Sequence, residues 1–318
     1  MFSVNTKEED GFEIVVLKDE LANTNVKIIP ACGAILHAFN INYGKDTLNI
    51  IDHYNSRKEF EEQVETKGFK GCKLSPFVCR LKEGKYEFGD KEYIIEKFYL
   101  GNHALHGIIY DASFDIVKLD AGAESASVEL LFAYKGKDKG FPFKYDCRII
   151  YELQKNNSLE ITTVIKNHES FAIPVADGWH PYFSFGGPIN DLQLSFKCEH
   201  MLEFDEELIP TNKKLPYPAF KTLTQIGDTV FDNGFLVDFN DTIPVVILRD
   251  EEKELQLEIQ PDPSYPFLQI YTPGHRQSIA IENLSAAPDA FNNENGLTIL
   301  PAGNEAIYKT NFRISNSQ

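Results

Sequence analysis

Short β-strand patterns follow one another along almost the whole chain, and this succession limits the possible folds more than any other feature of the sequence. Runs such as FEIVVLK, SLEITTVIKN and FLQIYT carry β-branched and aromatic residues in partial alternation. Turn-forming stretches such as KGKDKGFP, KNNS and TPGH separate them. The strands do not alternate with helices, which argues against βαβ units and a parallel sheet. The pattern predicts an all-β protein built as a sandwich of antiparallel sheets.

Few other elements are expected. One helix is predicted within residues 55–66, because NSRKEFEEQVET opens with the capping residues Asn55 and Ser56 and contains neither Gly nor Pro. Residues 201–225 are expected to form a long irregular connection, of the kind that often borders a site. Because no linker, composition break or short repeat divides the sequence, we expect a single domain over residues 1–318.

The charge balance argues against several classes of partner. The chain has 318 residues, with 48 acidic and 31 basic side chains and a net charge of -17. Such an acidic surface disfavours nucleic acid and anionic membranes, but it says little about a small neutral ligand. No apolar run approaches the length of a membrane span, and no secretory signal is recognisable. We expect a small-molecule substrate, no nucleic-acid or membrane partner, and a monomer or a homodimer.

The cysteines predict a reducing compartment. Their number is odd and none forms a CxxC pair, so we expect free thiols in the cytoplasm. A zinc site would need a tighter cluster of Cys and His, and we therefore expect no metal. The five cysteines are Cys32, Cys72, Cys79, Cys147 and Cys198.

One aromatic stretch, PVADGWHPYFSF, holds the only Trp of the chain, Trp179, followed directly by His180. A His in an apolar segment is usually a structural residue with a hydrogen-bonded partner. Aromatic rings beside polar groups also suit a sugar, however, since its C–H face stacks on rings and its hydroxyls need donors and acceptors. Further on, SIAIEN places Glu282 in a mostly apolar strand, where a Glu is either paired or functional.

Other polar residues have two possible interpretations each. His103 and His106 in GNHALHG would suit a metal site on a helix, but the following GIIYDASF has the pattern of a strand. Arg80 is either a surface residue or the partner that keeps a buried carboxylate charged. Asp232 in FDNG is either a turn former or a site residue. The sequence contains no nucleotide-binding fingerprint, GxSxG elbow or HExxH motif.

Taken in order, these motifs resemble those of the aldose 1-epimerase (galactose mutarotase-like) family. The resemblance extends from about residue 25 to the end of the chain. Two departures leave the sugar open: Asn283 stands where a Pro usually follows the family's Glu, and Ile108 where a second Gly is common. The matching stretches are LSPFVCR with Arg80, ALHG with His106, WHPYF with His180, FDNGF with Asp232, and IAIENLSAAPDAFN with Glu282.

The resemblance implies a β-supersandwich with few short helices and a cofactor-independent interconversion of the α and β anomers of an aldose. Glu282 would be the base that takes the proton of the C1 hydroxyl, and His180 the acid that protonates the ring oxygen. We expect His180 to stay protonated near neutrality beside the carboxylate. No cofactor is needed for this chemistry. The residues implied to hold the sugar or orient the pair are Arg80, His106, Asp232 and Trp179.

Two other functions stay open at this point. A hexose-6-phosphate 1-epimerase would need cations at the rim of the cleft, and Lys70, Lys73, Lys82 and Arg276 are candidates. The same fold could instead serve as a non-catalytic carbohydrate-binding protein, although a pure binder has no need of an acid–base pair. The acidic balance favours a neutral aldose over an anionic one.

Overall fold

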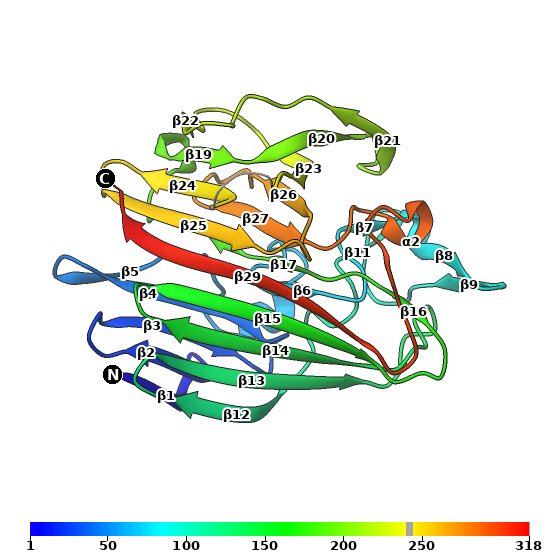
Figure 1. Cartoon of the computed structure of the whole chain (residues 1–318), viewed down its shortest axis with the longest axis horizontal. Coiled ribbons are helices and arrows are strands. Elements are labelled where there is room, and N and C mark those ends of the chain that lie inside the picture. Colours follow the sequence, from blue (N-terminus) through cyan, green and yellow to red (C-terminus); the bar gives the residue numbers. More distant parts are fainter. Residues whose placement is uncertain (240–243, 318) are drawn as a thin grey trace.

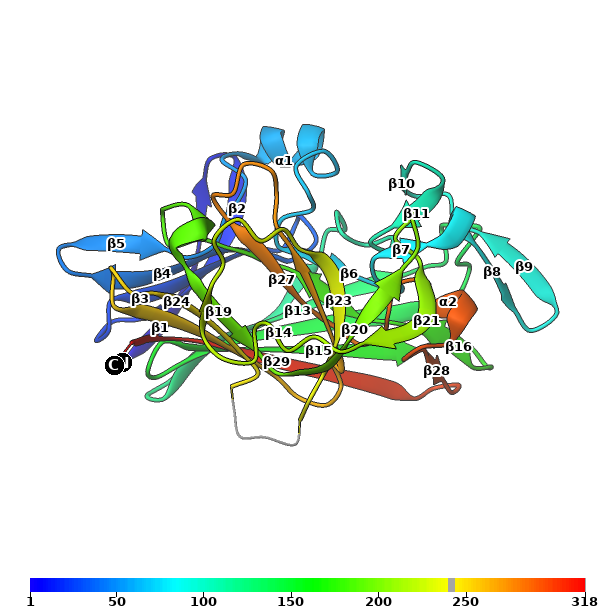
Figure 2. The ribbon, with the colours of Figure 1, turned by 90° about the horizontal axis from the view of Figure 1, so that it is seen from above.

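The computed structural model describes residues 1–239 and 244–317, and two large sheets dominate it (Figures 1 and 2). The first has nine strands and crosses the front of Figure 1. Its strands, in spatial order, are β12 (Asp115–Ala121), β13 (Ser125–Tyr134), β14 (Tyr145–Gln154), β15 (Ser158–Asn167), β29 (Glu305–Asn316), β25 (Leu255–Pro261), β24 (Val246–Asp250), β19 (Gln193–Phe196) and β22 (Thr224–Gln225).

The second large sheet carries the residues of greatest functional interest. In spatial order its strands are β21 (Pro210–Leu215), β20 (Cys198–Phe204), β23 (Asp232–Val237), β26 (Phe267–Tyr271), β27 (Ile279–Leu284), β17 (Gly178–His180) and β6 (Cys72–Leu74), with β18 (Tyr182–Phe183) also pairing with β27. Paired strands run antiparallel in both large sheets, which confirms the predicted all-β antiparallel architecture.

Smaller elements flank these sheets. The N-terminal sheet contains β1 (Phe2–Glu9), β2 (Phe12–Asp19), β3 (Thr24–Ile29), β4 (Ile35–Tyr43) and β5 (Asp46–Asn49). The other short strands are β7 (Arg80–Leu81), β10 (Tyr99–Leu100) and β11 (His103–Leu105) in one sheet, the hairpin of β8 (Lys85–Phe88) and β9 (Lys91–Ile94), and the pair β16 (Ile173–Val175) and β28 (Thr298–Leu300). The helical elements are α1 (Arg57–Gln63), α2 (Ala290–Asn293) and 3-10 turns at Lys82–Gly84 and Ile189–Asp191.

The main core lies between the two large sheets. Tyr151 of β14 and Ile161 of β15 belong to the same buried apolar cluster as Trp179 of β17 and Ile281 of β27. Seen from above in Figure 2, β15 and β29 lie on one side of β27, and α1 lies on the other. Because successive side chains of a strand point to opposite faces, the neighbours of these core residues point away from the core. The side chains that point away from the core lie on the outer face of the second sheet, where they can form a site.

Two local predictions have clear outcomes. The predicted helix exists as α1, where the Ser56 hydroxyl accepts a hydrogen bond from the Glu59 amide at 3.2 Å. The prediction of an irregular connection over residues 201–225 holds for residues 216–223 and is wrong for residues 201–215, where β20 and β21 form a hairpin. Its turn is made by the Asp205 carboxylate, which accepts from the amides of Glu207 and Ile209 at 2.9 and 3.0 Å. Asp is a common turn former, so Asp205 was a turn signal that the sequence analysis did not use.

Candidate active site

A pocket on the outer face of the second sheet brings together five of the six predicted site residues. It has a volume of about 820 Å³, which includes its open mouth. The register of the sheet explains the grouping: β27 lies between β17 and β26, and Gln269 of β26 is directly opposite Glu282. The predicted residues that line the pocket are Arg80, His106, His180, Asp232 and Glu282.

The predicted acid and base lie side by side. His180 Nε2 is 3.4 Å from Glu282 Oε1, and the two side chains are only 6% and 2% exposed. Burial lowers the pKa of His180 to about 4. Burial also raises the pKa of Glu282 well above its usual range; the charge of Asp232 adds to this rise, and Arg80 opposes it. Among the described residues, His180 Nδ1 and Glu282 Oε2 have no hydrogen-bond partner.

These pKa directions contradict the expectation that His180 is protonated near neutrality. The imidazolium would lose its hydration inside the protein, and the contact to Glu282 does not compensate for this loss. Both shifts favour the neutral forms, with the shared proton on the Glu282 carboxyl rather than on His180. The pair still holds one transferable proton and one proton acceptor, which is what general acid–base chemistry requires.

His106 owes its position to an unusual backbone. Its φ of 61° is left-handed, and Gly107 follows with a φ of 77°. A Cβ on Gly107 would come within 2.3 Å of the Ser75 carbonyl oxygen, so only Gly fits in the ALHG motif. The His106 ring packs edge-on against His180, with ring centres 4.8 Å apart. Burial lowers the pKa of His106 well below its usual range, so this ring is a neutral donor or acceptor.

Arg80 and Asp232 reach the pocket from β7 and β23. Asp232 begins a strand rather than lying in a turn, and it accepts a hydrogen bond from Gln269 Nε2 at 3.0 Å. Burial raises the pKa of Asp232, and the Arg80 charge opposes this rise. No ion pair joins Arg80 to a carboxylate among the described residues, so its effect on Glu282 acts through space.

Sequence analysis did not single out Gln269 or Tyr182, which also line the pocket. Gln269 Oε1 is buried without a partner in the described part of the chain. The sequence feature that could have identified Gln269 is a single Gln in the apolar strand FLQIYT.

Tyr182 stacks on His180 with ring centres 5.1 Å apart and an interplanar angle of 20°. A Cβ on Gly68 would lie 2.6 Å from the Tyr182 hydroxyl, so Gly68 lets its loop pack against this ring.

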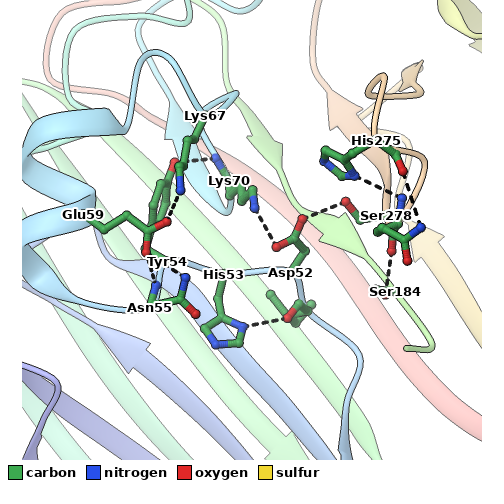
Figure 3. A network of polar contacts seen from close by, with 12 residues as sticks. Asp52, His53, Tyr54, Asn55, Glu59, Lys67, Lys70, Ser184, His275 and Ser278 are labelled. Carbon is green, nitrogen blue, oxygen red and sulfur yellow. Dashed lines mark hydrogen bonds and ion pairs between the residues drawn. The ribbon is translucent and has the colours of Figure 1, made fainter. Parts of the chain in front are cut away.

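Figure 3 shows a polar network next to the part of the pocket wall that Tyr182 and Gly68 form. Asp52 is its centre: its carboxylate accepts from Lys70 Nζ at 2.6 Å and from the Ser278 hydroxyl at 2.7 Å. The Asp52 amide donates to the Tyr182 carbonyl at 2.9 Å. Because Ser278 directly precedes β27, the network ties the loop of Lys70 and the segment of Tyr182 to the strand that carries Glu282. It also engages Lys70 in an ion pair.

Trp179 lies outside the pocket, which argues against its predicted contact with the sugar. It is adjacent to His180 in β17 and therefore points to the opposite face, into the core. Its ring packs against Tyr151 with centres 5.8 Å apart. Lys73 Nζ lies 4.3 Å from the centre of the Trp179 ring. The Trp is thus part of the packing behind the site.

The cations considered for a phosphate group do not gather at the pocket. Lys73 is completely buried in an ion pair with Asp177. Arg276 donates to the Asn190 side chain and to two backbone carbonyls. Lys82, like these two and Lys70, is absent from the pocket wall. Among the described residues that line the pocket, Arg80 is the only Lys or Arg, and three carboxylates, those of Glu65, Asp232 and Glu282, belong to the same lining.

The described residues contain neither a cluster of metal-binding side chains nor a helix that could span a membrane. No group of three or more His, Cys, Asp or Glu side chains is placed to hold a metal ion within residues 1–239 and 244–317. No helix in the same ranges is long and apolar enough to cross a membrane. All of the cysteines are free and buried.

Comparison with known proteins gives the family. The model of the aldose 1-epimerase family matches residues 13–313, which is nearly the whole chain. The chain belongs to the aldose 1-epimerase family. Membership confirms the predicted enzyme class, an isomerase of the aldose 1-epimerase type, and supports sugar epimerase or mutarotase activity. The uncharacterized protein YihR of Escherichia coli K12 is 24% identical over 240 residues, which cover 73% of this chain and 75% of YihR.

Solved structures show that the aldose 1-epimerase fold is shared. A galactose mutarotase-like protein from Clostridium acetobutylicum superposes with a TM-score of 0.88 and 19% identity, covering 99% of both chains. Galactose 1-epimerase from Lactobacillus acidophilus gives a TM-score of 0.82 and 18% identity, covering 100% of this chain and 99% of the other. These likenesses confirm the galactose mutarotase-like supersandwich.

Proposed function

We propose that this aldose 1-epimerase interconverts the α and β anomers of a neutral aldose, with Glu282 and His180 as its acid–base pair. The observation that carries the proposal is the 3.4 Å contact between the two side chains in a pocket lined by further polar groups. Both side chains are almost fully buried. Both also have a polar atom without a partner among the described residues, and sugar hydroxyls would satisfy these atoms.

The chemistry needs two proton movements and no cofactor. Transfer of the shared proton from Glu282 to His180 gives the reactive form of the pair. The Glu282 carboxylate then takes the proton from the C1 hydroxyl while His180 donates its proton to the ring oxygen. The C1–O5 bond breaks and C1 becomes an aldehyde. Rotation about C1–C2 and the reverse proton transfers close the ring with the other configuration. Each positioned group contributes typically about a hundred- to ten-thousand-fold to the rate.

Substrate binding is proposed for the other polar residues of the pocket. Arg80 and Asp232 offer a donor and an acceptor to the sugar hydroxyls. His106 Nδ1 and Gln269 Oε1 have no partner among the described residues, and both residues line the pocket. A neutral sugar rich in hydroxyls can pair with all of these groups. We also propose the reducing cytoplasm as the location of the reaction, with which buried free cysteines are compatible.

A neutral sugar fits this pocket better than a hexose 6-phosphate does. Phosphate recognition normally employs several cations, and Arg80 is the only one in the described lining. The carboxylate of Glu65 at the exposed side of the pocket would repel a phosphate.

Anomer exchange measured by saturation-transfer NMR tests the proposal. Wild-type protein should accelerate exchange of glucose or galactose, with a higher kcat/KM than for glucose 6-phosphate. Glu282→Gln should abolish exchange while calorimetry still detects sugar binding, because the amide keeps the size of the side chain but cannot accept the proton. A wild-type protein that binds sugars without accelerating exchange would show a carbohydrate-binding protein instead.

A further inference from the structure

The side chains of Glu282 and His180 meet because of the way their strands are paired. Gly178 of β17 lies opposite Leu284 of β27, so two positions further along β17 His180 lies opposite Glu282. The pairing of β18 with β27 continues the same register. Opposite residues of an antiparallel pair have their side chains on the same face of the sheet. The distance between the two groups therefore depends on how β27 lies against β17 and β18.

Backbone pairing is interrupted at this point of the sheet. Pro181 separates β17 from β18 and has no amide hydrogen to donate. Its carbonyl accepts from the Ile281 amide at 3.3 Å, which is long for a backbone hydrogen bond. On its other side β27 is fully paired with β26, so its freedom to move is toward β17. The side chains do not restrict this freedom, because Glu282 Oε2 and His180 Nδ1 have no hydrogen-bond partner among the described residues.

Asn283 connects β27 to the other large sheet. It follows Glu282 in the strand, so its side chain points to the opposite face, into the core. Asn283 Nδ2 donates to Thr310 Oγ1 at 2.9 Å, and the two residues are 0% and 1% exposed. Thr310 lies on β29, the central strand of the nine-stranded sheet. Because only Glu282 and Asn283 have polar side chains in β27, this is the one side-chain hydrogen bond from β27 to that sheet in the described part of the chain.

The core offers the Asn283 side chain no alternative partner. Its Oδ1 atom has no hydrogen-bond partner among the described residues, so the Thr310 hydroxyl is the only one the amide group has. Ile161, opposite Thr310, and Leu268, opposite Asn283, both belong to the buried apolar cluster. A polar group buried among apolar side chains is costly without a partner. Loss of the hydroxyl would therefore favour a different position of the amide group, and of β27 with it.

We propose that Asn283 and Thr310 are positioning residues, whose hydrogen bond across the core sets the distance between Glu282 and His180. The inference rests on the proposed anomer exchange, in which these two groups exchange protons with the sugar. A displacement of about 1 Å in a reacting group can slow an enzyme about a hundredfold. The other polar residues of the pocket lie on β7, β23, β26 and the loop after β11. Loss of the hydrogen bond therefore lowers kcat and leaves KM unchanged.

Two substitutions separate the hydrogen bond from the packing. Thr310→Val keeps the shape of the side chain and removes the hydroxyl, whereas Thr310→Ser keeps the hydroxyl and removes a methyl group. Measured by saturation-transfer NMR, kcat should fall about tenfold or more in Thr310→Val and stay within about twofold in Thr310→Ser, with KM within about twofold in both. Thr162→Val is the matched control. Thr162 is adjacent to the core residue Ile161 in β15 and so faces away from the core.

A second variant addresses the stability of the first. Asn283→Leu combined with Thr310→Val removes both polar groups, so no buried donor is left without a partner and the fold should be retained. Urea denaturation checks this. The double variant should remain about tenfold slower than the wild type, because the connection between the sheets is still missing. A kcat equal to that of the wild type would show that packing alone positions β27.

The remaining outcomes distinguish the two proposals. A Thr310→Val variant with the kcat of the wild type, or a Thr310→Ser variant that is equally slow, would overturn the positioning role and leave anomer exchange intact. Absence of exchange in the wild type would refute the anomer exchange instead. The positioning role is then decided by the ¹⁵N NMR shifts of the His180 ring, assigned with His180→Asn. A shift changed in Thr310→Val alone supports the role, and identical shifts in wild type and both variants overturn it.

Discussion

Removing the buried Lys73 charge should destabilise the protein strongly while leaving the pocket wall chemically unchanged. Lys73 Nζ contacts Asp177 and donates to the Gly178 carbonyl at 3.1 Å, and the two charged side chains are both 0% exposed. Burial lowers the pKa of Lys73 and raises that of Asp177, and each partner opposes the shift of the other. The Tyr265 hydroxyl donates to the same carboxylate at 2.7 Å. These contacts favour the charged forms of both groups and oppose the effect of burial.

Lys73→Met keeps much of the side-chain length but leaves Asp177 as a buried carboxylate with one remaining donor, that of Tyr265. Breaking a fully buried ion pair on one side costs about 3–5 kcal/mol of folding free energy. Adding Asp177→Asn removes the stranded charge, and the amide oxygen still accepts from Tyr265. The double variant should therefore recover at least half of the loss, because the pair is coupled.

Urea denaturation monitored by fluorescence gives the free energies of unfolding. Lys27→Met is the control, since Lys27 and its partner Glu9 are 18% and 31% exposed and their pair should be worth about 1 kcal/mol or less. A loss below about 1 kcal/mol for Lys73→Met, or a double variant as unstable as the sum of its parts, would refute the reasoning.

Three further predictions concern protons. His180→Asn should lower kcat about a hundredfold or more, and the double variant with Glu282→Gln should be little worse than the worse single variant, since either lost proton step blocks the cycle. In a pH–rate profile, kcat/KM should fall as the pH drops through about 4, where His180 of the free enzyme takes up a second proton and the pair loses its acceptor; a limb centred near 6.5 would contradict this. Burial lowers the pKa of His37 to about 3, so the unfolded chain binds its proton first as the pH falls. Between pH 7 and 5 the wild type should therefore lose about 2 kcal/mol of unfolding free energy relative to His37→Phe, measured by urea denaturation; equal losses would exclude His37 as the cause.

The fold could be predicted from the sequence because its determinants are local. Alternating apolar residues identify the strands, and the absence of helical periods between them excludes crossover connections. The hairpin of β20 and β21 was not predicted, although Asp205 is a residue type that commonly forms turns. Glu282 could be singled out as a charge in an apolar strand, whereas the roles of the other site residues were implied by the resemblance to the family.

Other features depend on distant parts of the chain. The low pKa of His180 comes from burial, and the burial of Lys73 follows from its pairing with Asp177, 104 positions away. The residues next to His180 and Lys73 in the sequence indicate neither the low pKa nor the burial. The orientation of Trp179, in contrast, could have been predicted, because adjacent residues of a strand cannot face the same ligand. The prediction of a sugar contact for Trp179 and His180 together overlooked this rule.

The alternation in β27 also limits how such a protein can change over evolutionary time. Glu282 faces the pocket and Ile281 faces the core, so deleting one residue earlier in the strand would exchange their faces and place a carboxylate in the apolar interior. A two-residue change would restore the faces but move the carboxylate about 6.6 Å along the strand, away from His180. Insertions and deletions should therefore be tolerated better in surface loops than within β27.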